Sequence, residues 1–237
     1  MSDTKRKVVL SLYDFTGEAL KPWAQAGYEC YAFDIQHDDQ VVETYEGGGS
    51  IHYRHADLHD HTHLNAIQDQ FNDGSVAFGM AFPVCTDMAV SGAAHFASKL
   101  KADPEFQTKA VTYATMCADF FDALKVPYFI ENPVSVLATK WRKPDYSFHP
   151  YLYGGYIPQE ESEHPEWPQY IAPRDAYPKK TCLWTGNSFV MPDFKPVTVE
   201  DGYARQHLKL GGKSMKTKNI RSATPRGFAR AVYEANT

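Results

Sequence analysis

Cysteines are scarce in this 237-residue chain, and none of them has a spacing typical of a metal site or a disulfide framework. The four lie far apart, without a C-x-x-C pair, at Cys30, Cys85, Cys117 and Cys182. A structural zinc site and a disulfide-stapled fold are therefore not expected. Three histidines alternate beside two aspartates at His59, His61 and His63. That pattern is more typical of a polar connection than of metal ligands, so we predict no metal.

Long apolar runs are also missing. The run that follows the basic N-terminal residues is too short for a signal peptide or a membrane span. We therefore expect a cytoplasmic protein with reduced thiols and no membrane partner. The Gly-x-Gly-x-x-Gly fingerprint of dinucleotide-binding proteins is absent, and so is the Gly-x-x-x-x-Gly-Lys-Ser/Thr loop, which disfavours a nucleotide triphosphatase. The sequence contains no internal repeat and no low-complexity tract.

Apolar and aromatic residues are abundant. They make up 43% and 14% of the chain, which is enough for one sizeable core and argues against a disordered protein. The net charge of −5 argues against a general nucleic-acid coat protein. The charge is spread unevenly, however, and its distribution is more informative than its sum.

Apolar runs alternate with helix-like stretches along the first half of the chain. The pattern predicts strands at 8–13, 28–35, 50–55, 75–82, 127–130 and 181–184, and helices ending at Ala26 and covering 61–72, 105–125 and 225–235. For the last helix, Thr224 is the expected N-cap and Pro225 the first helical residue. This alternation predicts an α/β fold, with a mostly parallel sheet and helices on both faces.

Three segments differ in texture. Residues 1–140 are expected to form an α/β core that binds a cofactor and carries the chemistry. Residues 141–180 are rich in proline, tyrosine, tryptophan and histidine, and we expect an irregular aromatic-rich insertion there. Residues 181–237 are expected to complete the core with a return strand, a basic loop and a terminal helix.

Polar residues follow the first three predicted strands. Gly17 lies in the first turn, where it would let the backbone approach a ligand, and Asp34 ends the second strand. Asp57 follows the third. Open α/β sheets bind ligands at the carboxyl ends of their strands, so Asp34 is placed to bind a ribose diol and Asp57 to contact a base edge. The alternative is that these residues only make turns.

Two further segments follow apolar strands 46 positions apart. Cys85 comes after a strand in a loop, whereas the other three cysteines lie in apolar or helical patterns typical of buried thiols. A helix beginning near Asp87 would favour its thiolate. Glu131 directly follows a second apolar strand, where partial desolvation suits an acid. At the ends of neighbouring strands, these residues would place a nucleophile and an acid in one pocket.

The order of these segments resembles that of the cytosine-5 DNA methyltransferases, and in particular a compact group of phage and prophage proteins. The similar segments are Phe15-Thr16-Gly17, Pro83-Val84-Cys85-Thr86-Asp87 with Val90-Ser91-Gly92-Ala93, Glu131-Asn132-Pro133, and Lys179 to Trp184. The resemblance covers residues 8–235 approximately. It implies a Rossmann-like class I methyltransferase fold and transfer of a methyl group from S-adenosylmethionine to cytosine C5 in DNA.

The resemblance also implies residue roles. Cys85 would be the nucleophile that adds to C6, and Glu131 the acid at N3. The cofactor would be held by Tyr13, Asp14, Phe15, Thr16, Gly17, Asp34, Asp57 and Pro83. Catalysis would take place on a base turned out of the duplex. The protein would be encoded by a phage or prophage and act in the bacterial cytoplasm.

The sequence departs from the family at several positions. Tyr13 stands where the family has an acid, Val84 replaces a proline, and Pro133 replaces a valine. No Gln-x-Arg-x-Arg segment and no recognition domain of the usual size are found. These departures leave two alternatives open, namely action on RNA or a free pyrimidine nucleotide, and a non-catalytic DNA-binding protein with a methyltransferase fold.

The C-terminal segment is basic. From Tyr203 to Tyr233 it carries eight lysines and arginines and no acid: Arg205, Lys209, Lys213, Lys216, Lys218, Arg221, Arg226 and Arg230. With Gly211-Gly212, the spacing suggests a mobile loop that follows phosphates, and we predict that the first six bind nucleic acid. A solvated surface stretch is the alternative.

Overall fold

The computed structural model describes residues 7–199, 201–211 and 214–237. It divides into two compact units. The sheet unit comprises Met1–Phe15, Trp23–Ser147 and Thr181–Phe189, and the second unit comprises Thr16–Pro22, Phe148–Lys180 and Val190–Thr237.

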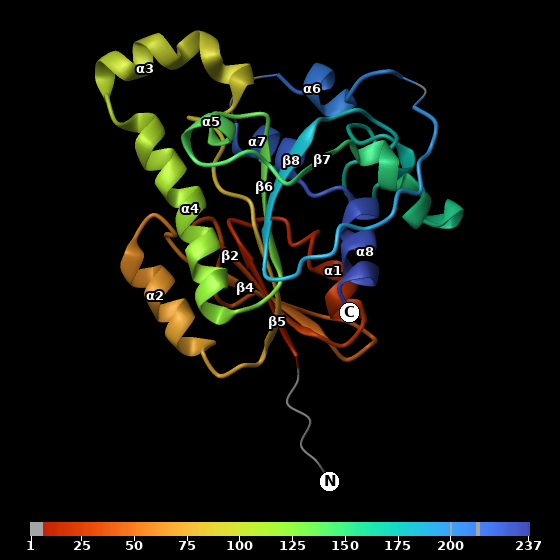
Figure 1. Ribbon diagram of the computed structural model, residues 1–237. Helices are drawn as coiled ribbons and strands as arrows, with labels where there is room; N and C mark the ends of the chain where they lie inside the picture. The colour runs from red at the N-terminus through yellow and green to blue at the C-terminus, as the bar shows by residue number, and fades with distance from the viewer. Residues whose placement is uncertain (1–6, 200, 212–213) are drawn as a thin grey trace. The chain divides into compact units, whose positions relative to one another are not determined.

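The sheet has eight strands in the order β3-β4-β2-β1-β5-β6-β8-β7 (Figure 1). Their bounds are Val8–Leu12 (β1), Glu29–Asp34 (β2), Val42–Thr44 (β3), Ser50–His55 (β4), Val76–Ala81 (β5), Tyr128–Pro133 (β6), Tyr146–Phe148 (β7) and Thr181–Gly186 (β8). Strands β4, β2, β1, β5 and β6 pair in parallel. Strands β3 and β8 pair antiparallel to β4 and β6. The α/β prediction is thus confirmed, and the sheet expected to be mostly parallel is mixed, with five parallel strands at its centre and antiparallel strands outside them.

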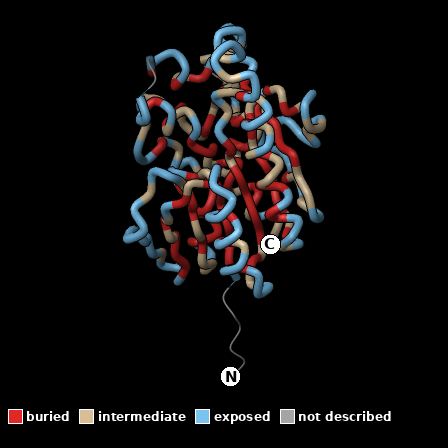
Figure 2. Tube along the Cα trace, turned by 90° about the vertical axis from the view of Figure 1, so that its left-hand side faces the viewer, coloured by how far each residue is buried: buried red, intermediate tan, exposed pale blue. Residues whose placement is uncertain are grey.

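Helices α2 (His61–Gln70) and α4 (Phe106–Leu124) lie side by side over one face of this sheet (Figure 1). Strand β1 is buried on both faces, as its mostly apolar sequence predicts, and its alternate residues Val8, Leu10 and Leu12 pack in the core shared with these helices. Buried positions, red in Figure 2, run along the extended segments of the interior.

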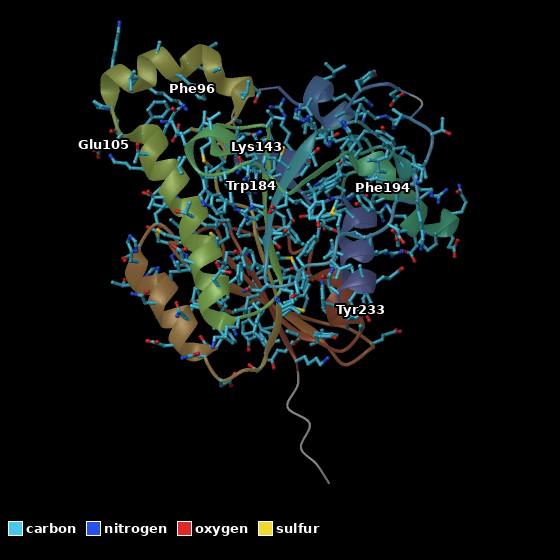
Figure 3. The ribbon with its side chains drawn as sticks, in the orientation of Figure 1. Phe96, Glu105, Lys143, Trp184, Phe194 and Tyr233 are labelled. Atoms are coloured by element: carbon cyan, nitrogen blue, oxygen red, sulfur yellow. The ribbon has the colours of Figure 1, made fainter. Side chains whose placement is uncertain are left out.

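The opposite face of the strands is packed with aromatic rings. Trp23, from the short helix α1 (Lys21–Gln25), stacks on Phe78 of β5 with ring centroids 4.9 Å apart. Phe78 in turn lies 6.2 Å from Phe129 of β6. Trp184 of β8 (labelled in Figure 3) belongs instead to the core shared with α2 and α4, where it is fully buried, stacks on Trp141 and donates its indole N–H to the Arg142 carbonyl at 2.7 Å.

The strand order reverses at β1. Chain connections run outward from β1 through β2 to β4 on one side, and from β5 to β6 on the other. In open α/β sheets such a reversal leaves a crevice at the carboxyl ends of the strands, where ligands bind. The segments following β1, β5 and β6 therefore lie where a site is expected.

Three further elements complete the sheet unit: the 3-10 helix η1 (Val90–His95), α3 (Phe96–Ala102) and α5 (Leu137–Lys140). Among the described residues, no helix combines the length and the apolar character needed to cross a bilayer.

The second unit is built from short 3-10 turns and three helices. They are η2 (Pro150–Tyr156), η3 (Gln159–Glu161), η4 (Pro173–Asp175), α6 (Arg205–Lys209), α7 (Met215–Ser222) and α8 (Arg226–Ala235). Its core includes Phe148 stacked on Phe228, with centroids 4.1 Å apart. Two expectations are corrected here. The basic segment forms helices α6 and α7 where a loop was predicted, and α8 begins at Arg226 with Pro225, not Thr224, at the N-cap.

Candidate active site

The predicted nucleophile and acid come from neighbouring parallel strands. Cys85 lies four residues after the end of β5, and Glu131 lies near the end of β6. The two strands pair with Ala81 opposite Ile130, so the residues that follow these positions reach the same edge of the sheet. Neighbouring strands are about 4.8 Å apart, which places both segments at one side of the switch-point crevice.

The loop that carries Cys85, residues 82–89, is here called the nucleophile loop. It is anchored before the cysteine by two hydrogen bonds to neighbouring strands. The Phe82 N–H donates to the Leu12 carbonyl of β1 at 3.0 Å. The buried side chain of Asn132 donates from Nδ2 to the Pro83 carbonyl, also at 3.0 Å. Since Asn132 directly follows Glu131, this bond fixes the nucleophile loop against the strand that carries the acid.

The far end of the loop is anchored to the segment after β6. The Val136 N–H donates to the Met88 carbonyl at 3.0 Å, and the Val90 N–H donates to the Val134 carbonyl at the same distance. Between the anchors the chain turns around one carbonyl, because the N–H groups of Met88 and Ala89 both donate to the carbonyl oxygen of Cys85. The backbone around the thiol is thus held in a tight turn.

The expected helix near Asp87 does not form. Residues after Cys85 make a turn, and the first helical segment is η1, a 3-10 helix that begins at Val90. No helix dipole therefore acts on the thiol from Asp87, and that part of the prediction was wrong. Two features accompany the missing helix. No side chain caps the start of η1, and the N–H groups of Met88 and Ala89 already donate to the Cys85 carbonyl.

The four cysteines differ in burial. Cys30, Cys117 and Cys182 are buried, and desolvation raises the pKa of both Cys30 and Cys117 far above the ordinary thiol value. Cys85 is half-buried. Because the thiolate is the reactive form, burial disfavours reaction at Cys30 and Cys117, whereas the half-buried Cys85 can be reached by a reagent or substrate.

The backbone turns sharply directly after β1. Tyr13 has a left-handed backbone (φ +58°), which costs energy in a residue other than glycine. Its hydroxyl donates to the Leu58 carbonyl at 3.0 Å, and burial raises its pKa well above the usual value. Asp14 is buried and accepts a hydrogen bond from Ser11 Oγ at 2.7 Å. Phe15 is 38% exposed and stacks on His37.

The remaining predicted cofactor residues lie at the ends of other strands or in the second unit. Asp34 ends β2, is half-buried, and accepts hydrogen bonds from the N–H and side chain of Gln36 at 2.9 and 3.1 Å. Asp57 accepts from the His59 N–H at 3.0 Å.

Gly17 has a φ of +67°, as expected for a turn glycine. Thr16 Oγ1 accepts from the Glu18 N–H, and Pro83 is buried in the nucleophile loop.

Two of these side chains have the chemistry that a bound nucleoside needs. A strand-end carboxylate (Asp34) suits a ribose diol, and an exposed ring (Phe15) suits the face of a base. Sequence reasoning missed two residues that shape this site. Ser11 is a polar residue inside an otherwise apolar strand, and that contrast was the available signal. The contact of Asn132 with the nucleophile loop had no sequence signal beyond its position next to Glu131.

The residues predicted to contact nucleic acid differ in how far their cationic groups are engaged with other parts of the protein. Arg205 pairs with Asp201, and Lys209 donates to the Gln169 carbonyl at 3.2 Å. The Arg221 guanidinium donates to the carbonyls of residues 206, 207 and 210, so it holds α7 to the chain around α6. Lys216 and Lys218 are exposed on α7. Lys213 lies outside the described residues.

A pocket of about 420 Å³ lies elsewhere in the sheet unit, between β2, β4 and α2. Tyr31, Phe33, Arg54 and His63 are among its lining residues, and neither Cys85 nor Glu131 is. Most of its polar groups already have partners. Arg54 donates to the Asp39 carbonyl at 2.6 Å, and His63 Nδ1 accepts from the Asp57 N–H at 3.0 Å.

Comparison with known proteins gives structural likenesses but no family and no curated relative. The sequence matches no protein-family profile and no curated protein. Among solved structures, the chain is similar to an E. coli crystal structure assigned as a DNA modification methyltransferase encoded within a prophage, with 13% identity and a TM-score of 0.43. The alignment covers 82% of this chain and 53% of that one, so the chain spans about half the length of the structure it matches.

Proposed function

We propose that the protein methylates cytosine at C5 in DNA through a covalent adduct with Cys85. The observation that carries this proposal is the half-buried thiol of Cys85 on a loop hydrogen-bonded to the residue after Glu131. A nucleophile and an acid on neighbouring strand ends suit a substrate that must be attacked at one atom and protonated at another. Cytosine is such a ring, because C5 is a poor nucleophile until a group has added at C6.

Each protein group has a defined task in this reaction. The Cys85 thiolate forms a bond to C6 while Glu131 gives a proton to N3, which turns C5 into an enamine carbon. S-Adenosylmethionine, when bound, supplies the methyl group that C5 takes. Loss of the C5 proton to a base then restores the C5–C6 double bond and expels the Cys85 thiolate. Glu131 recovers its proton from N3, so the enzyme is regenerated.

The cofactor would lie at the switch-point crevice. Asp34 would bind the ribose hydroxyls, and Phe15 would contact the adenine face. Asp57 and Pro83 would flank the adenine, while the chain from Tyr13 to Gly17 would border the methionine part. The two left-handed residues of this segment, Tyr13 and Gly17, support a path that lets backbone groups approach a ligand closely.

DNA is the proposed substrate because lysines gather on α7. Lys216 and Lys218 are exposed there, and we propose that they contact phosphates together with Lys209 and Lys213. Arg205 and Arg221 would act less directly, since their guanidinium groups already hold Asp201 and backbone carbonyls. The favoured alternative is methylation of a pyrimidine in RNA or in a free nucleotide. The short second unit supports that alternative because it offers little room for a sequence-reading domain.

The test is transfer of a tritiated methyl group from S-adenosylmethionine to duplex DNA, single-stranded DNA, RNA and free cytidine nucleotides. We expect duplex DNA to be the best acceptor. Cys85→Ser should abolish transfer, and the matched variant Cys117→Ser should keep most of it, because that thiol is buried in the core. Equal activity of the two variants would exclude Cys85 as the nucleophile.

A second experiment traps the adduct. DNA containing 5-fluorocytosine cannot lose a proton from C5, so the Cys85–C6 bond should persist after methyl transfer and survive denaturing electrophoresis. We expect a cross-linked band that requires S-adenosylmethionine and disappears in Cys85→Ser. Methylation of ordinary DNA without any trapped band would refute the covalent route while leaving the methyltransferase activity intact.

A further inference from the structure

Lysine 99 joins helix α3 to the middle of the nucleophile loop. Its ammonium group donates to the Thr86 carbonyl at 3.0 Å and to Asp87 Oδ1 at 2.5 Å. Thr86 and Asp87 are the two residues that directly follow Cys85. Phe96 and Glu105, labelled in Figure 3, mark the helix that carries Lys99 and the start of the next helix.

The contact differs in kind from the other anchors of the loop. Those described above use backbone groups or the buried Asn132 side chain, and they act before Cys85 or from Met88 onward. Lys99 acts between them, on the turn itself. Its side chain is 31% exposed and that of Asp87 is 42% exposed, so the pair can open and close without disturbing the core.

We propose that Lys99 and Asp87 are a positioning pair that holds the Cys85 thiol in its reactive place. The proposal rests on the proposed function for its catalytic meaning, but the loop contact itself can be tested without any methyl transfer. Neither residue touches the substrate in this assignment. They act through the turn around the Cys85 carbonyl. Opening of that turn would move the Cys85 sulfur away from the face of the cytosine ring, so fewer protein molecules would hold the thiol where it can react.

The experiment measures the rate at which iodoacetamide alkylates Cys85 in the folded protein, by mass spectrometry of its peptide. The other three cysteines are buried and serve as internal references. Lys99→Met should raise the alkylation rate two- to fivefold, the range expected for loss of a partly exposed ion pair. Lys101→Met is the matched control, since Lys101 is an exposed lysine on the same helix, and it should leave the rate unchanged.

The charge-swapped double variant Asp87→Lys with Lys99→Asp separates pairing from simple damage. It should return the alkylation rate most of the way to that of the wild type. In methyl-transfer assays, Lys99→Met should lower kcat and leave the KM for DNA unchanged, with the swap restoring kcat. Equal alkylation of the Lys99→Met and Lys101→Met variants, or a swap that restores nothing, would overturn the pairing. If alkylation behaves as expected while wild type transfers no methyl group, the proposed function fails and the loop assignment stands.

Discussion

Asparagine 132 shows how one side chain can define a site without taking part in its chemistry. Its Nδ2 donates to the Pro83 carbonyl, and its Oδ1 is buried with no protein partner among the described residues. The bond from Nδ2 is buried, where a hydrogen bond is costly to lose. That donor connects the strand of the proposed acid to the loop of the proposed nucleophile.

Replacing this side chain should therefore cost stability. In Asn132→Ala the Pro83 carbonyl loses its donor in a buried place, and we expect the free energy of unfolding to fall by about 1–2 kcal/mol. Urea denaturation monitored by circular dichroism measures this. The control Asn72→Ala changes an exposed asparagine after α2 and should change stability by less than about 0.5 kcal/mol. Equal stability of the two variants would show that the buried bond contributes nothing.

The burial of a single residue was predictable from the sequence where its position in or directly after an apolar strand decided its environment. Cys85 stood out because it follows an apolar run, and the structure leaves it half-buried while the other three cysteines are buried. The pairing of Lys99 with Asp87 was not predictable, since the two residues lie 12 positions apart with the 3-10 helix η1 between them. Pairings of this kind depend on how the chain folds back, which no local pattern records.

At the scale of elements, helix α8 is tied to the second unit by a buried acid. Asp175 is fully buried at the end of η4 and accepts a hydrogen bond from the Gly227 N–H in the first turn of α8 at 2.9 Å. Desolvation raises the pKa of this carboxyl to about 6, and the hydrogen bond from Gly227 and the nearby Arg226 lower it only in part. This carboxyl therefore takes up a proton at a higher pH in the folded protein than an exposed aspartate does.

This environment gives the stability a pH dependence. The folded-state pKa of about 6 exceeds the ordinary value of 3.8, so the folded protein binds more protons between these values and its stability falls as pH rises through them. In Asp175→Asn that loss is absent. We expect its free energy of unfolding, relative to wild type, to increase between pH 4 and pH 6 by up to about 3 kcal/mol.

Subtracting the free energy of unfolding of the wild type from that of the variant cancels the contributions of other titrating groups. His164 has a pKa lowered to about 4 by burial, which makes stability rise with pH over part of the same range in both proteins. Urea titrations at several pH values give the difference directly. Asp193→Asn, at an exposed aspartate of the same unit, should show a difference that does not vary with pH. A flat difference for Asp175→Asn would mean that this carboxyl is not desolvated.

Elements were predictable where apolar residues follow a period. The six predicted strands are all present, and so are the helices around 61–70 and 106–124. Helix α7 was missed because its sequence is mostly polar. It is held by the Ser214 cap, which accepts from the Thr217 N–H, and by the bonds of Arg221 to the carbonyls around α6. Strand β3 was missed because all three of its residues are exposed.

At the scale of the whole molecule, charge opposes the proposed partner. The net charge is −5, so attraction to DNA must come from local groups rather than from the overall field. Lys216 and Lys218 on α7 are exposed, whereas Arg221 on the same helix is engaged with carbonyls. A cationic side chain releases counterions from DNA only where it can reach a phosphate.

We therefore expect the Lys216→Ala/Lys218→Ala double variant to bind duplex DNA more weakly and with a smaller salt dependence. The slope of log affinity against log salt should decrease in magnitude by roughly 2, since each phosphate contact contributes about 0.9. Fluorescence anisotropy of a labelled duplex at several KCl concentrations measures this slope. The exposed pair Lys140→Ala/Lys143→Ala serves as control. An unchanged slope in the α7 variant would remove that helix from the interface.

The fold as a whole followed from the alternation of strands and helices, but the place of the last strand did not. Residues 181–184 were expected to return to the sheet, and nothing in their sequence told whether they would join its edge or its interior. The answer depends on β7, a strand of only three residues, which was not predicted at all. Short strands carry too little pattern to be read, although they decide the order of their neighbours.

The interior position of β8 has a consequence for synthesis. It lies between β6 and β7 although it follows both in the chain, so residues 128–133 emerge from the ribosome about fifty residues before their partner. Until then the β6 backbone presents open hydrogen-bonding groups on that side, which is a surface that invites association between nascent chains. Strand β8 can cover these groups only after residues 181–186 have been synthesised. We expect chains cut short before β8 to associate more readily than the full chain.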